Sequence, residues 1–564
     1  MEERRCFTMY RLKAISSLEK VMPTDSLTAY APVTAVRGLQ GERVSFQIQI
    51  GYEPPEEGRF SRRAGFYTLR SPLRAATQVA RVGWIPVELA AYAERSDDDY
   101  ISKAPGLYPD VLFPLKPKEA FYFQCYTPTV LMVTVDIPAD QPAGEYPLYF
   151  TFTTEGKTIE KHALKVMVRV ENLAIKKNDL VFTQWFHCDS IADYHGVKMM
   201  SEKHWKLIEN YIKTAARTGI TMLLTPIFTP PLDTMIGGER PTMQLIKIKK
   251  EGGCYSFDFT LLHRWVALCL KYGIEYFEMA HLFTQWGVAN CPKIMVEIEG
   301  KQVQEFGWHV AACSPEYQHF LSQLLPALTR ELKALGIADK TYFHISDEPS
   351  ADPEKEDYQN YLKAKNFVKP YLKDFKIMDA LSHLEFYENG LIEYPVCATN
   401  RIEPFMAADI SERWCYYCCS QGQLVGNRFL AMPSYRNRIL GVQLFMGDMF
   451  GFLQWGYNYY YTERSRFKVD PYANSDGCQS YPAGDPFSVY PYGNGAIESI
   501  RTVVFYQAIQ DRALLQMLAE KIGLKETKAW VNSLAGMTID FKNYPRSAEF
   551  LENLHDQILD RLTQ

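Results

Sequence analysis

The sequence contains no apolar stretch long enough to cross a lipid bilayer. Residues 439–453 come closest, but they are few and are interrupted by Asp448, whereas a spanning helix needs about 20 apolar residues. The N-terminal segment has charge but no continuous apolar core, so it is not typical of a signal peptide. The 12 cysteines are scattered, which favours reduced thiols over a disulfide framework. We therefore expect no membrane span and a cytoplasmic location.

Signatures of several large protein classes are also missing. The net charge is −5 and no basic tract stands out, so nucleic acid is not an expected partner. The chain lacks an HExxH motif, a Walker loop and a dinucleotide fingerprint. A Gly-x-Ser-x-Gly motif is absent as well, which weakens an esterase hypothesis. Cys415 and Cys418 have the CxxC spacing of a zinc or redox site. On a strand, however, residues three apart point to opposite faces, so these two thiols should not converge on one site. We expect no metal and no organic cofactor.

The first part of the chain predicts β-sheet. Apolar and polar residues alternate at 44–50, 131–137, 148–153 and 164–170, with turn-rich segments between. This period places one face of each strand in a core and the other toward water. We predict an N-terminal β-sandwich over residues 1–175, with a structural or substrate-positioning role.

From residue 176 onward short apolar runs alternate with amphipathic helices. Three helices are each followed by Gly-Ile and a strand, at Gly219, Gly273 and Gly336, as expected where glycine ends a helix. Residues 176–520 predict a (β/α)8 barrel. The alternative is an open doubly wound sheet, but that fold is expected to carry a Gly-rich phosphate loop after its first strand, and the sequence has none there. Residues 521–564 predict helices packed on the outside of the barrel. The eight strands are expected near 181–186, 221–225, 276–280, 342–346, 376–382, 395–399, 413–419 and 452–458.

The ends of these strands carry the candidate site, because barrel active sites lie at the C-terminal ends of the strands. Asp347 and Glu348 follow the fourth strand, and a pair of carboxyl groups can cleave a glycosidic bond. The alternative is that Asp347 only caps the next helix. Further polar and aromatic residues near strand ends suit a sugar, and we take them as candidate substrate contacts: His344, Asp379, Tyr416, Trp455 and Asn458.

Several segments resemble glycoside hydrolase family 123 and its uncharacterised relatives. The segment Phe-His-Ile-Ser-Asp-Glu-Pro at 343–349 is similar to the catalytic strand of that family. Residues 18–21 and 41–47 look like its N-terminal domain, residues 451–458 like its last barrel strand, and residues 484–491 with 499–501 like the loop and helix that follow. The resemblance covers nearly the whole chain, and it is more specific for fold than for substrate.

The resemblance implies an exo-acting, retaining β-N-acetylgalactosaminidase that uses substrate-assisted catalysis. The 2-acetamido carbonyl of the substrate would attack the anomeric carbon and form an oxazolinium ion. Asp347 would orient the acetamido group, and Glu348 would protonate the leaving group and then activate water. We expect a raised pKa for Glu348 and an ionised Asp347.

Other functions stay open at this stage. One is a glycosidase that combines Glu348 with a distant carboxylate such as Asp379. Another is a carbohydrate-binding protein without activity, and a third is a purely structural protein. The expected partner is a glycan or glycoconjugate, and the sequence does not fix the sugar, the linkage or the oligomeric state.

Overall fold

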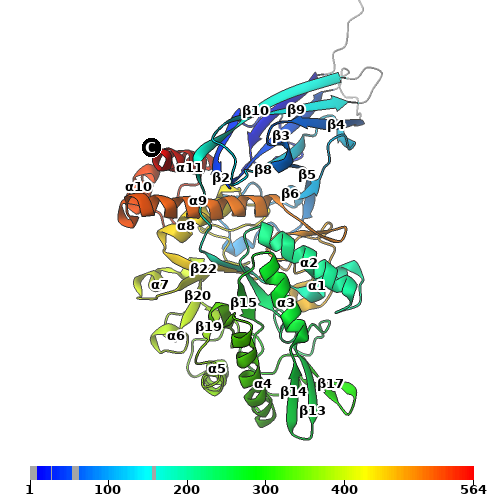
Figure 1. Ribbon diagram of the computed structural model, residues 1–564, viewed down its shortest axis with the longest axis vertical. Helices are drawn as coiled ribbons and strands as arrows, with labels where there is room; N and C mark the ends of the chain where they lie inside the picture. Colours follow the sequence, from blue (N-terminus) through cyan, green and yellow to red (C-terminus); the bar gives the residue numbers. More distant parts are fainter. Residues whose placement is uncertain (1–8, 27, 54–61, 155–159) are drawn as a thin grey trace, which may run out of the picture.

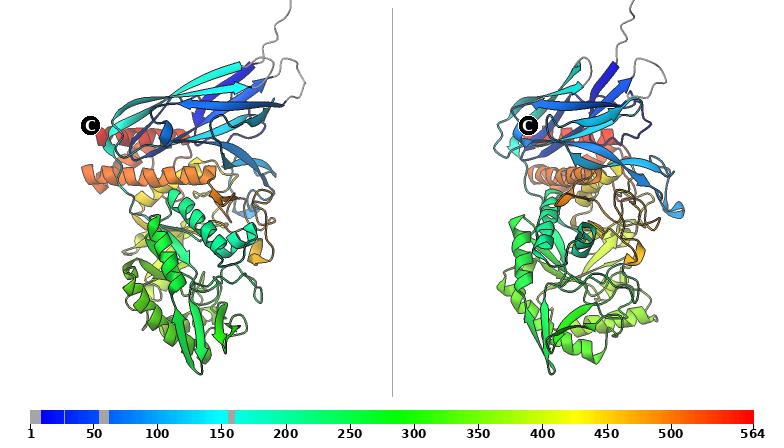
Figure 2. Two further views of the ribbon diagram at one scale, coloured as in Figure 1. Left: turned by 45° about the vertical axis from the view of Figure 1, so that its right-hand side comes forward. Right: turned by 90° about the vertical axis from the view of Figure 1, so that its right-hand side faces the viewer.

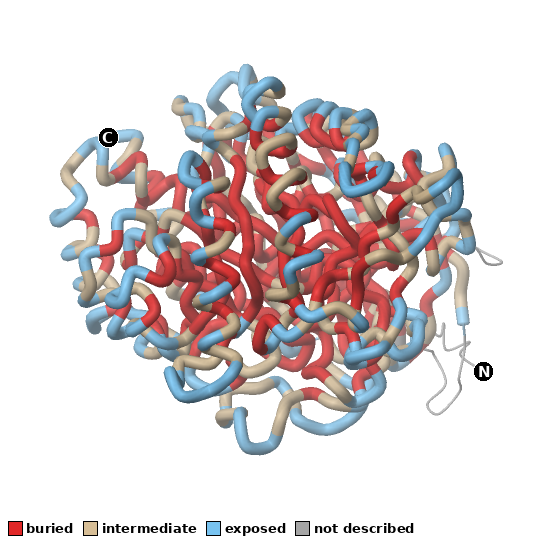
Figure 3. The backbone as a smooth tube through the Cα atoms, turned by 90° about the horizontal axis from the view of Figure 1, so that it is seen from below, coloured by how far each residue is buried: buried red, intermediate tan, exposed pale blue. Residues whose placement is uncertain are grey.

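The computed structural model describes residues 9–26, 28–53, 62–154 and 160–564. A β-rich N-terminal part lies at one end, the long helix α9 (Ile500–Ile522) crosses beneath it, and an α/β part lies beyond (Figures 1 and 2). Viewed along the long axis, buried residues fill the middle of the molecule and exposed residues lie at its periphery (Figure 3). Among the described residues no helix is long and apolar enough to cross a membrane.

The N-terminal part is a sandwich of two five-stranded sheets, as the alternation predicts. Their inner faces share a core that includes Phe46, Ile48, Phe150 and Val166. The first sheet has the order β1 (Met9–Ser16), β3 (Arg43–Glu53), β8 (Thr129–Asp136), β5 (Thr77–Val87) and β6 (Gly106–Pro114). The second has the order β2 (Ala35–Gln40), β10 (Glu160–Ala174), β9 (Gly144–Thr154), β4 (Arg62–Arg70) and β7 (Phe121–Gln124).

Strand β3 departs from the expected half-buried pattern, because both of its faces are covered. Ser45, Gln47 and Gln49 are buried although they alternate with the apolar residues of the core. The outer face of this sheet contacts helix α9, and the backbone N–H of Arg43 donates to Gln510 on that helix at 2.8 Å. The Gln47 amide nitrogen donates to two backbone carbonyls, those of Ser16 and Glu19.

The second part is a closed barrel of eight parallel strands with helices outside it, as predicted. Every expected strand is present, but three depart most from the predicted bounds: the fourth ends at Phe343, the seventh ends at Tyr416, and the last spans Met449–Gln454. Strand β11 closes the barrel by pairing with β22, from Val181 opposite Gly451 to Gln184 opposite Gln454. The order around the barrel is β11 (Val181–Gln184), β12 (Met222–Thr225), β15 (Tyr276–Met279), β18 (Thr341–Phe343), β19 (Lys376–Leu381), β20 (Tyr394–Ala398), β21 (Arg413–Tyr416) and β22 (Met449–Gln454).

The barrel helices begin and end where local chemistry dictates. Ser201 and Ser314 accept hydrogen bonds from the first turns of α2 (Glu202–Arg217) and α4 (Pro315–Ala334), which satisfies backbone donors that have no partner in the helix. Gly219, after α2, adopts a φ of 89°, which glycine tolerates best. The other helices up to α9 are α1 (Cys188–His195), α3 (Thr260–Lys271), α5 (Glu356–Val368), α6 (Glu385–Glu388), α7 (Glu403–Ala407) and α8 (Tyr435–Met446).

A small four-stranded sheet interrupts the barrel repeat and was not expected. Its order is β14 (Cys254–Asp258), β13 (Lys247–Glu251), β16 (Ile294–Ile298) and β17 (Lys301–Phe306). Glu299 and Gly300 join two of its strands and both have positive φ, as a two-residue hairpin turn requires. A second hairpin, of β23 (Tyr490–Tyr492) and β24 (Gly495–Ile497), precedes α9.

The C-terminal helices join the two parts of the molecule. Helix α10 (Leu524–Ala535) packs against α9. Helix α11 (Ala548–Thr563) contacts α8 and α9 and also strands β2 and β10 of the sandwich. The last segment therefore lies against the sandwich as well as against the barrel helices.

Candidate active site

A cavity of about 130 Å³ opens at the C-terminal ends of the barrel strands. Aromatic side chains form much of its wall, and carboxyl groups point into it. A larger polar cavity of about 540 Å³ lies between the sandwich and helices α9 and α11, away from the strand ends. The residues lining the smaller cavity are Trp185, His187, Leu232, Asp233, Gln285, Trp286, Asp347, Glu348, Ala380, Tyr416, Cys418, Cys419, Leu453, Trp455 and Tyr481.

Asp347 and Glu348 are both in the cavity wall, but their surroundings differ. Asp347 is buried, and its carboxylate accepts a hydrogen bond from the Gln285 amide at 2.6 Å. Glu348 is exposed and accepts a hydrogen bond from the Tyr416 hydroxyl at 2.9 Å. The backbone of Glu348 has a φ of 47°, which is uncommon for a non-glycine residue and turns the chain sharply after β18. The sharp turn places two neighbouring carboxyl groups in different surroundings, one buried and one exposed.

The protonation of Asp347 differs from the sequence-based expectation. Burial raises the pKa of Asp347 well above its ordinary value, and the nearby charge of Glu348 raises it further. The His344 cation and the Gln285 amide oppose this rise but do not cancel it. In the unliganded protein Asp347 therefore keeps its proton to a higher pH than an ordinary aspartate does. The sequence-based expectation was an ionised Asp347.

Beneath the acid pair lies a buried cluster of three charged side chains, contributed by neighbouring strands. His344 is fully buried between Asp379, 3.1 Å from its Nδ1, and Glu278, 2.6 Å from its Nε2. Burial alone would lower the pKa of His344, but hydrogen bonds and charge attraction from both carboxylates raise it to about 10. The ring is thus a cation at neutral pH.

Asp379 ties this cluster to the backbone that carries the acid pair. Its carboxylate accepts hydrogen bonds from the backbone N–H groups of Ile345 and Ser346, at 3.1 and 3.3 Å, and from the Tyr361 hydroxyl at 2.6 Å. Neither His344 nor Asp379 lines the cavity, although both were candidate substrate contacts. The structure places them behind the acid pair, where they fix the turn that follows β18.

One group of side chains has the composition of a metal site: His281, His344 and Asp379, with ligand atoms within 4.8 Å of one another. A metal ligand must offer a free lone pair. Both nitrogens of His344 already face carboxylates and carry protons, so this ring does not suit coordination. His281 instead stacks on His344, with ring centroids 4.1 Å apart.

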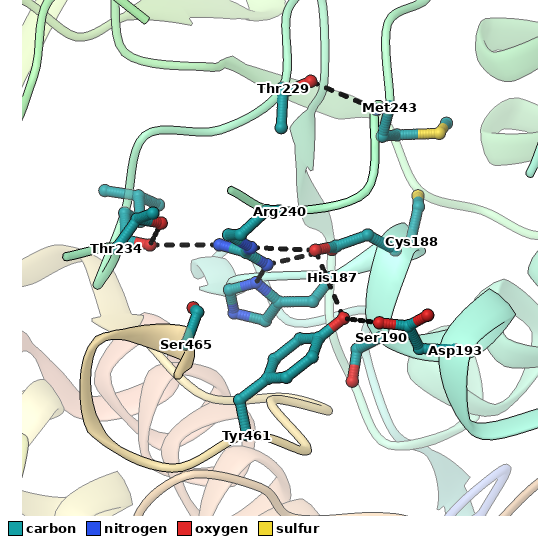
Figure 4. Close-up of polar contacts among 12 residues, drawn as sticks. His187, Cys188, Ser190, Asp193, Thr229, Thr234, Arg240, Met243, Tyr461 and Ser465 are labelled. Atoms are coloured by element: carbon teal, nitrogen blue, oxygen red, sulfur yellow. Dashed lines mark hydrogen bonds and ion pairs between the residues drawn. The ribbon is translucent and has the colours of Figure 1, made fainter. Parts of the chain in front are cut away.

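Elsewhere in the cavity wall the imidazole of His187 is held by a buried arginine (Figure 4). The guanidinium of Arg240 donates to His187 Nδ1 at 3.1 Å and forms a two-pronged ion pair with Asp189. Burial and the adjacent Arg240 charge lower the pKa of His187 to about 3. His187 is therefore neutral, and its Nε2–H faces the Trp455 carbonyl at 3.3 Å.

Asn458 supports His187 rather than lining the cavity. Its side-chain amide accepts from the His187 backbone N–H at 2.9 Å and donates to the His187 carbonyl at 3.0 Å. Strand β22 ends at Gln454, so Asn458 lies on the loop after the strand and folds back. This candidate substrate contact is fully buried.

Tyr416 and Trp455, the remaining candidates, do line the cavity. The Trp455 indole N–H donates to Asp485 at 2.8 Å, which fixes the ring at the cavity wall. Cys415 and Cys418 do not converge on one site: Cys415 packs in the apolar core outside the barrel strands, and Cys418 lines the cavity. Strand β21 ends at Tyr416, so Cys415 lies on the strand and Cys418 on the loop that follows it.

Several cavity residues were not among the sequence candidates. Trp185 follows β11 directly, and its indole N–H donates to Glu278 at 2.7 Å. Asp233 and Gln285 lie on long loops after β12 and β15, and the Asp233 N–H donates to the Gln285 side chain at 2.6 Å. Trp185 could have been found from its place at a strand end. The loop residues could not, because a loop conformation leaves no periodic signal in the sequence.

A closed barrel with carboxyl groups among aromatic side chains at its strand ends is an arrangement suited to the hydrolysis of glycosidic bonds. The family model described as the glycoside hydrolase 123 catalytic domain matches residues 185–518, more than half of the chain. The chain belongs to glycoside hydrolase family 123, and it is a glycosidase.

A solved structure agrees with this fold. A family 123 glycoside hydrolase from Clostridium perfringens, studied for glycolipid glycan hydrolysis, has a TM-score of 0.69 at 14% sequence identity, covering 98% of this chain and 97% of that chain. A family 2 member from Bacteroides cellulosilyticus has a TM-score of 0.28 at 10% identity, covering 77% of this chain and 46% of that one. No curated protein sequence matches this chain.

Proposed function

We propose that the protein is an exo-acting β-N-acetylgalactosaminidase that uses the 2-acetamido group of its substrate as the nucleophile. The observation that carries this proposal is the placement of two adjacent carboxyl groups, one buried and one exposed, at the same strand end. A carboxylate-nucleophile mechanism needs carboxyl groups about 5–5.5 Å apart on opposite sides of the bond. Neighbours on one turn are better suited to two atoms on the same side of the sugar.

In this mechanism Asp347 serves the acetamido group. Its carboxyl oxygen accepts the acetamido N–H and orients the carbonyl oxygen toward the anomeric carbon. The reacting form of the enzyme is the one in which Asp347 has already released its proton to solvent, and the positive charge of the oxazolinium ion stabilises this carboxylate as the ion forms. The Gln285 amide, 2.6 Å away, keeps the carboxyl group in place during this change.

Glu348 serves the leaving group from the open side of the cavity. Its proton passes to the glycosidic oxygen as the bond to the anomeric carbon breaks. The carboxylate then takes a proton from water, which attacks the anomeric carbon and reopens the oxazolinium ring. Inversion occurs twice, so the configuration is retained. Tyr416 donates to Glu348 and holds its carboxyl group at the cavity wall.

The substrate that we propose is the terminal sugar of a glycan or glycoconjugate. The small cavity suits one sugar residue at the end of a chain. Glycolipid glycan hydrolysis by the similar Clostridium perfringens enzyme is consistent with such a substrate. A competing mechanism with Asp379 as the nucleophile is disfavoured, because Asp379 is fully buried and its oxygens are occupied by His344, Tyr361 and two backbone N–H groups.

The test is hydrolysis of 4-nitrophenyl 2-acetamido-2-deoxy-β-galactoside beside the plain β-galactoside and the 2-acetamido-β-glucoside. We expect release from the acetamido-galactoside only. Asp347→Asn should lower kcat/KM on the order of 100- to 1,000-fold, since it removes a charge that stabilises the transition state. Glu348→Gln should cost on the order of 100- to 10,000-fold with an unactivated leaving group, and less with 4-nitrophenolate.

Two outcomes would contradict this function. Turnover of the plain galactoside would indicate a carboxylate nucleophile. Tight binding of the glycan without any turnover would indicate a carbohydrate-binding protein.

A further inference from the structure

The indole of Trp286 is exposed at the mouth of the cavity. This side chain lines the cavity and yet keeps 46% of its surface exposed. Large aromatic side chains are normally buried because their apolar surface is costly to hydrate. An exposed tryptophan at the mouth of a sugar-sized cavity therefore points to a ligand that covers it.

The backbone around Trp286 is in an unfavourable conformation. Trp286 and Val288 have φ values of 56° and 53°, and Gly287 between them has 121°. A bulky residue in the left-handed region is a conformational outlier, and such outliers cluster at ligand sites where the surrounding structure holds them. A side chain at Gly287 would lie only 2.4 Å from the Asp357 carboxylate, so this turn has little freedom to relax.

Hydrogen bonds connect this strained turn to the acid pair. The backbone N–H of Trp286 donates to the Asp347 carbonyl at 3.2 Å. The preceding residue, Gln285, donates to the Asp347 carboxylate. The indole is consequently fixed relative to Asp347 and to the cavity, and it does not sit on an independent loop tip.

A second loop fixes the orientation of the ring. The guanidinium of Arg464 stacks over the Trp286 indole, 5.8 Å from the ring centroid. Arg464 also has a positive φ, 58°, and its carbonyl accepts from the Met235 N–H at 3.0 Å. The arginine covers part of one face of the indole, and the remaining exposed surface is available to a ligand at the cavity mouth.

We propose that Trp286 is the platform of a second sugar-binding subsite, which takes the first ring of the leaving group. This proposal rests on the glycosidase function proposed above. Glu348, the exposed acid, faces the solvent side of the cavity, so the oxygen that it protonates and the group attached to it lie toward the mouth. The C–H face of a neutral pyranose ring stacks on the flat, apolar face of an indole. The enzyme therefore prefers a sugar, rather than a small alkyl group, as its leaving group.

The test compares two leaving groups on the same terminal sugar. One substrate is a disaccharide with 2-acetamido-2-deoxy-β-galactose linked to galactose, and the other is the methyl β-glycoside, whose leaving group has no ring. We expect Trp286→Ala to lower the ratio of kcat/KM for the disaccharide to that for the methyl glycoside about tenfold, mainly through KM. Trp286→Phe should restore part of this ratio, because a smaller aromatic ring still stacks.

Phe467→Ala is the matched control. Phe467 is a second exposed aromatic side chain, 72% exposed, on the loop that carries Arg464, and it does not line the cavity. Its removal should leave the substrate ratio within about twofold. Thermal unfolding of each variant shows whether the fold is intact.

The outcomes separate this subsite from the glycosidase function. An equal loss on both substrates in Trp286→Ala, or no loss on either, would overturn the subsite while the glycosidase function stands. If the wild-type protein cleaves neither substrate, the proposed function fails and the subsite fails with it. A selective loss on the disaccharide supports the subsite.

Discussion

Asp347 and Glu348 show how one turn of backbone places two neighbouring carboxyl groups in different surroundings. The deciding factor is burial: Asp347 is enclosed and Glu348 faces the open cavity. A neutral donor, the Gln285 amide, and a cation, His344, both act on Asp347. The pH at which Asp347 loses its proton is thus set by burial and the charge of Glu348, which raise its pKa, and by these two groups, which lower it.

At this scale we predict the effect of Gln285→Leu on the pH profile. Removing the amide removes a hydrogen bond that favours the ionised carboxylate, so the pKa of Asp347 rises further. In the proposed mechanism activity falls as the pH drops through this pKa. The acid limb of kcat/KM should therefore move to higher pH, whereas Gln302→Leu, an exposed glutamine on β17, should leave it in place. An acid limb that does not move in Gln285→Leu would show that Asp347 does not control it.

At the scale of elements, the crossing of helices α8 and α9 depends on one glycine. A Cβ atom at Gly441 would lie 1.8 Å from the backbone oxygen of Ala508 on α9. Glycine is normally disfavoured inside a helix by about 1 kcal/mol, so alanine would stabilise α8 if it were alone. Because the two helices approach so closely, we expect alanine at this position to destabilise the folded protein instead.

We therefore predict that Gly441→Ala destabilises the protein by about 3 kcal/mol, measured by denaturant unfolding. Gly253→Ala is the matched control, because nothing lies within 4 Å of a Cβ atom there. Its effect should stay within about 0.5 kcal/mol. If the two variants have the same free energy of unfolding, α8 and α9 can move apart without loss of stability.

Elements with a local signal could be predicted from the sequence, and pairings between elements could not. The eight barrel strands follow from periodicity, and the helix ends at Gly219, Gly273 and Gly336 follow from glycines that adopt a positive φ. The acid pair follows from its place at a strand end. The positions of His344 and Asp379 depend on the register of β15, β18 and β19, which pairs Glu278 with Tyr342, two residues before His344. Only with this register does the Glu278 carboxylate reach His344 Nε2 at 2.6 Å.

The sequence also misplaced features that depend on what covers them. Strand β3 alternates like a half-exposed strand but is buried on both faces, because a helix far away in the sequence packs on it. Asn458 looked like the end of a strand, yet β22 ends at Gln454 and the residue folds back onto His187. Such packing cannot be inferred from periodicity, which describes a strand without its neighbours.

At the scale of the whole molecule, a charged contact links the last helix to the sandwich. The Nε2 atom of His555 on α11 lies 2.7 Å from the Glu42 carboxylate, and its Nδ1 atom lies 3.7 Å from Asp556. Burial would lower the pKa of His555, but these carboxylates raise it to about 9. Because the folded state favours the protonated ring, its stabilisation is complete below pH 6.5 and is lost as the pH rises through 9.

We predict that His555→Gln narrows the difference in unfolding free energy between pH 6.5 and pH 9.5. The wild-type protein should lose up to roughly 3 kcal/mol from this group over that range, and the variant should not. The difference between the two proteins isolates His555 from other groups that titrate. If the unfolding free energies of the wild-type protein and the variant change with pH in parallel, this contact does not couple α11 to the sandwich.

Helix α9 also governs the order in which the molecule can be completed. Ile500 and Val504 of this helix share an apolar cluster with Ile15, Leu18 and Met132 of the sandwich. A chain emerging from the ribosome presents the sandwich first and α9 only after the whole barrel has been made. The outer face of the first sheet therefore stays uncovered for most of the time of synthesis, and a chain cut short before α9 would display it permanently.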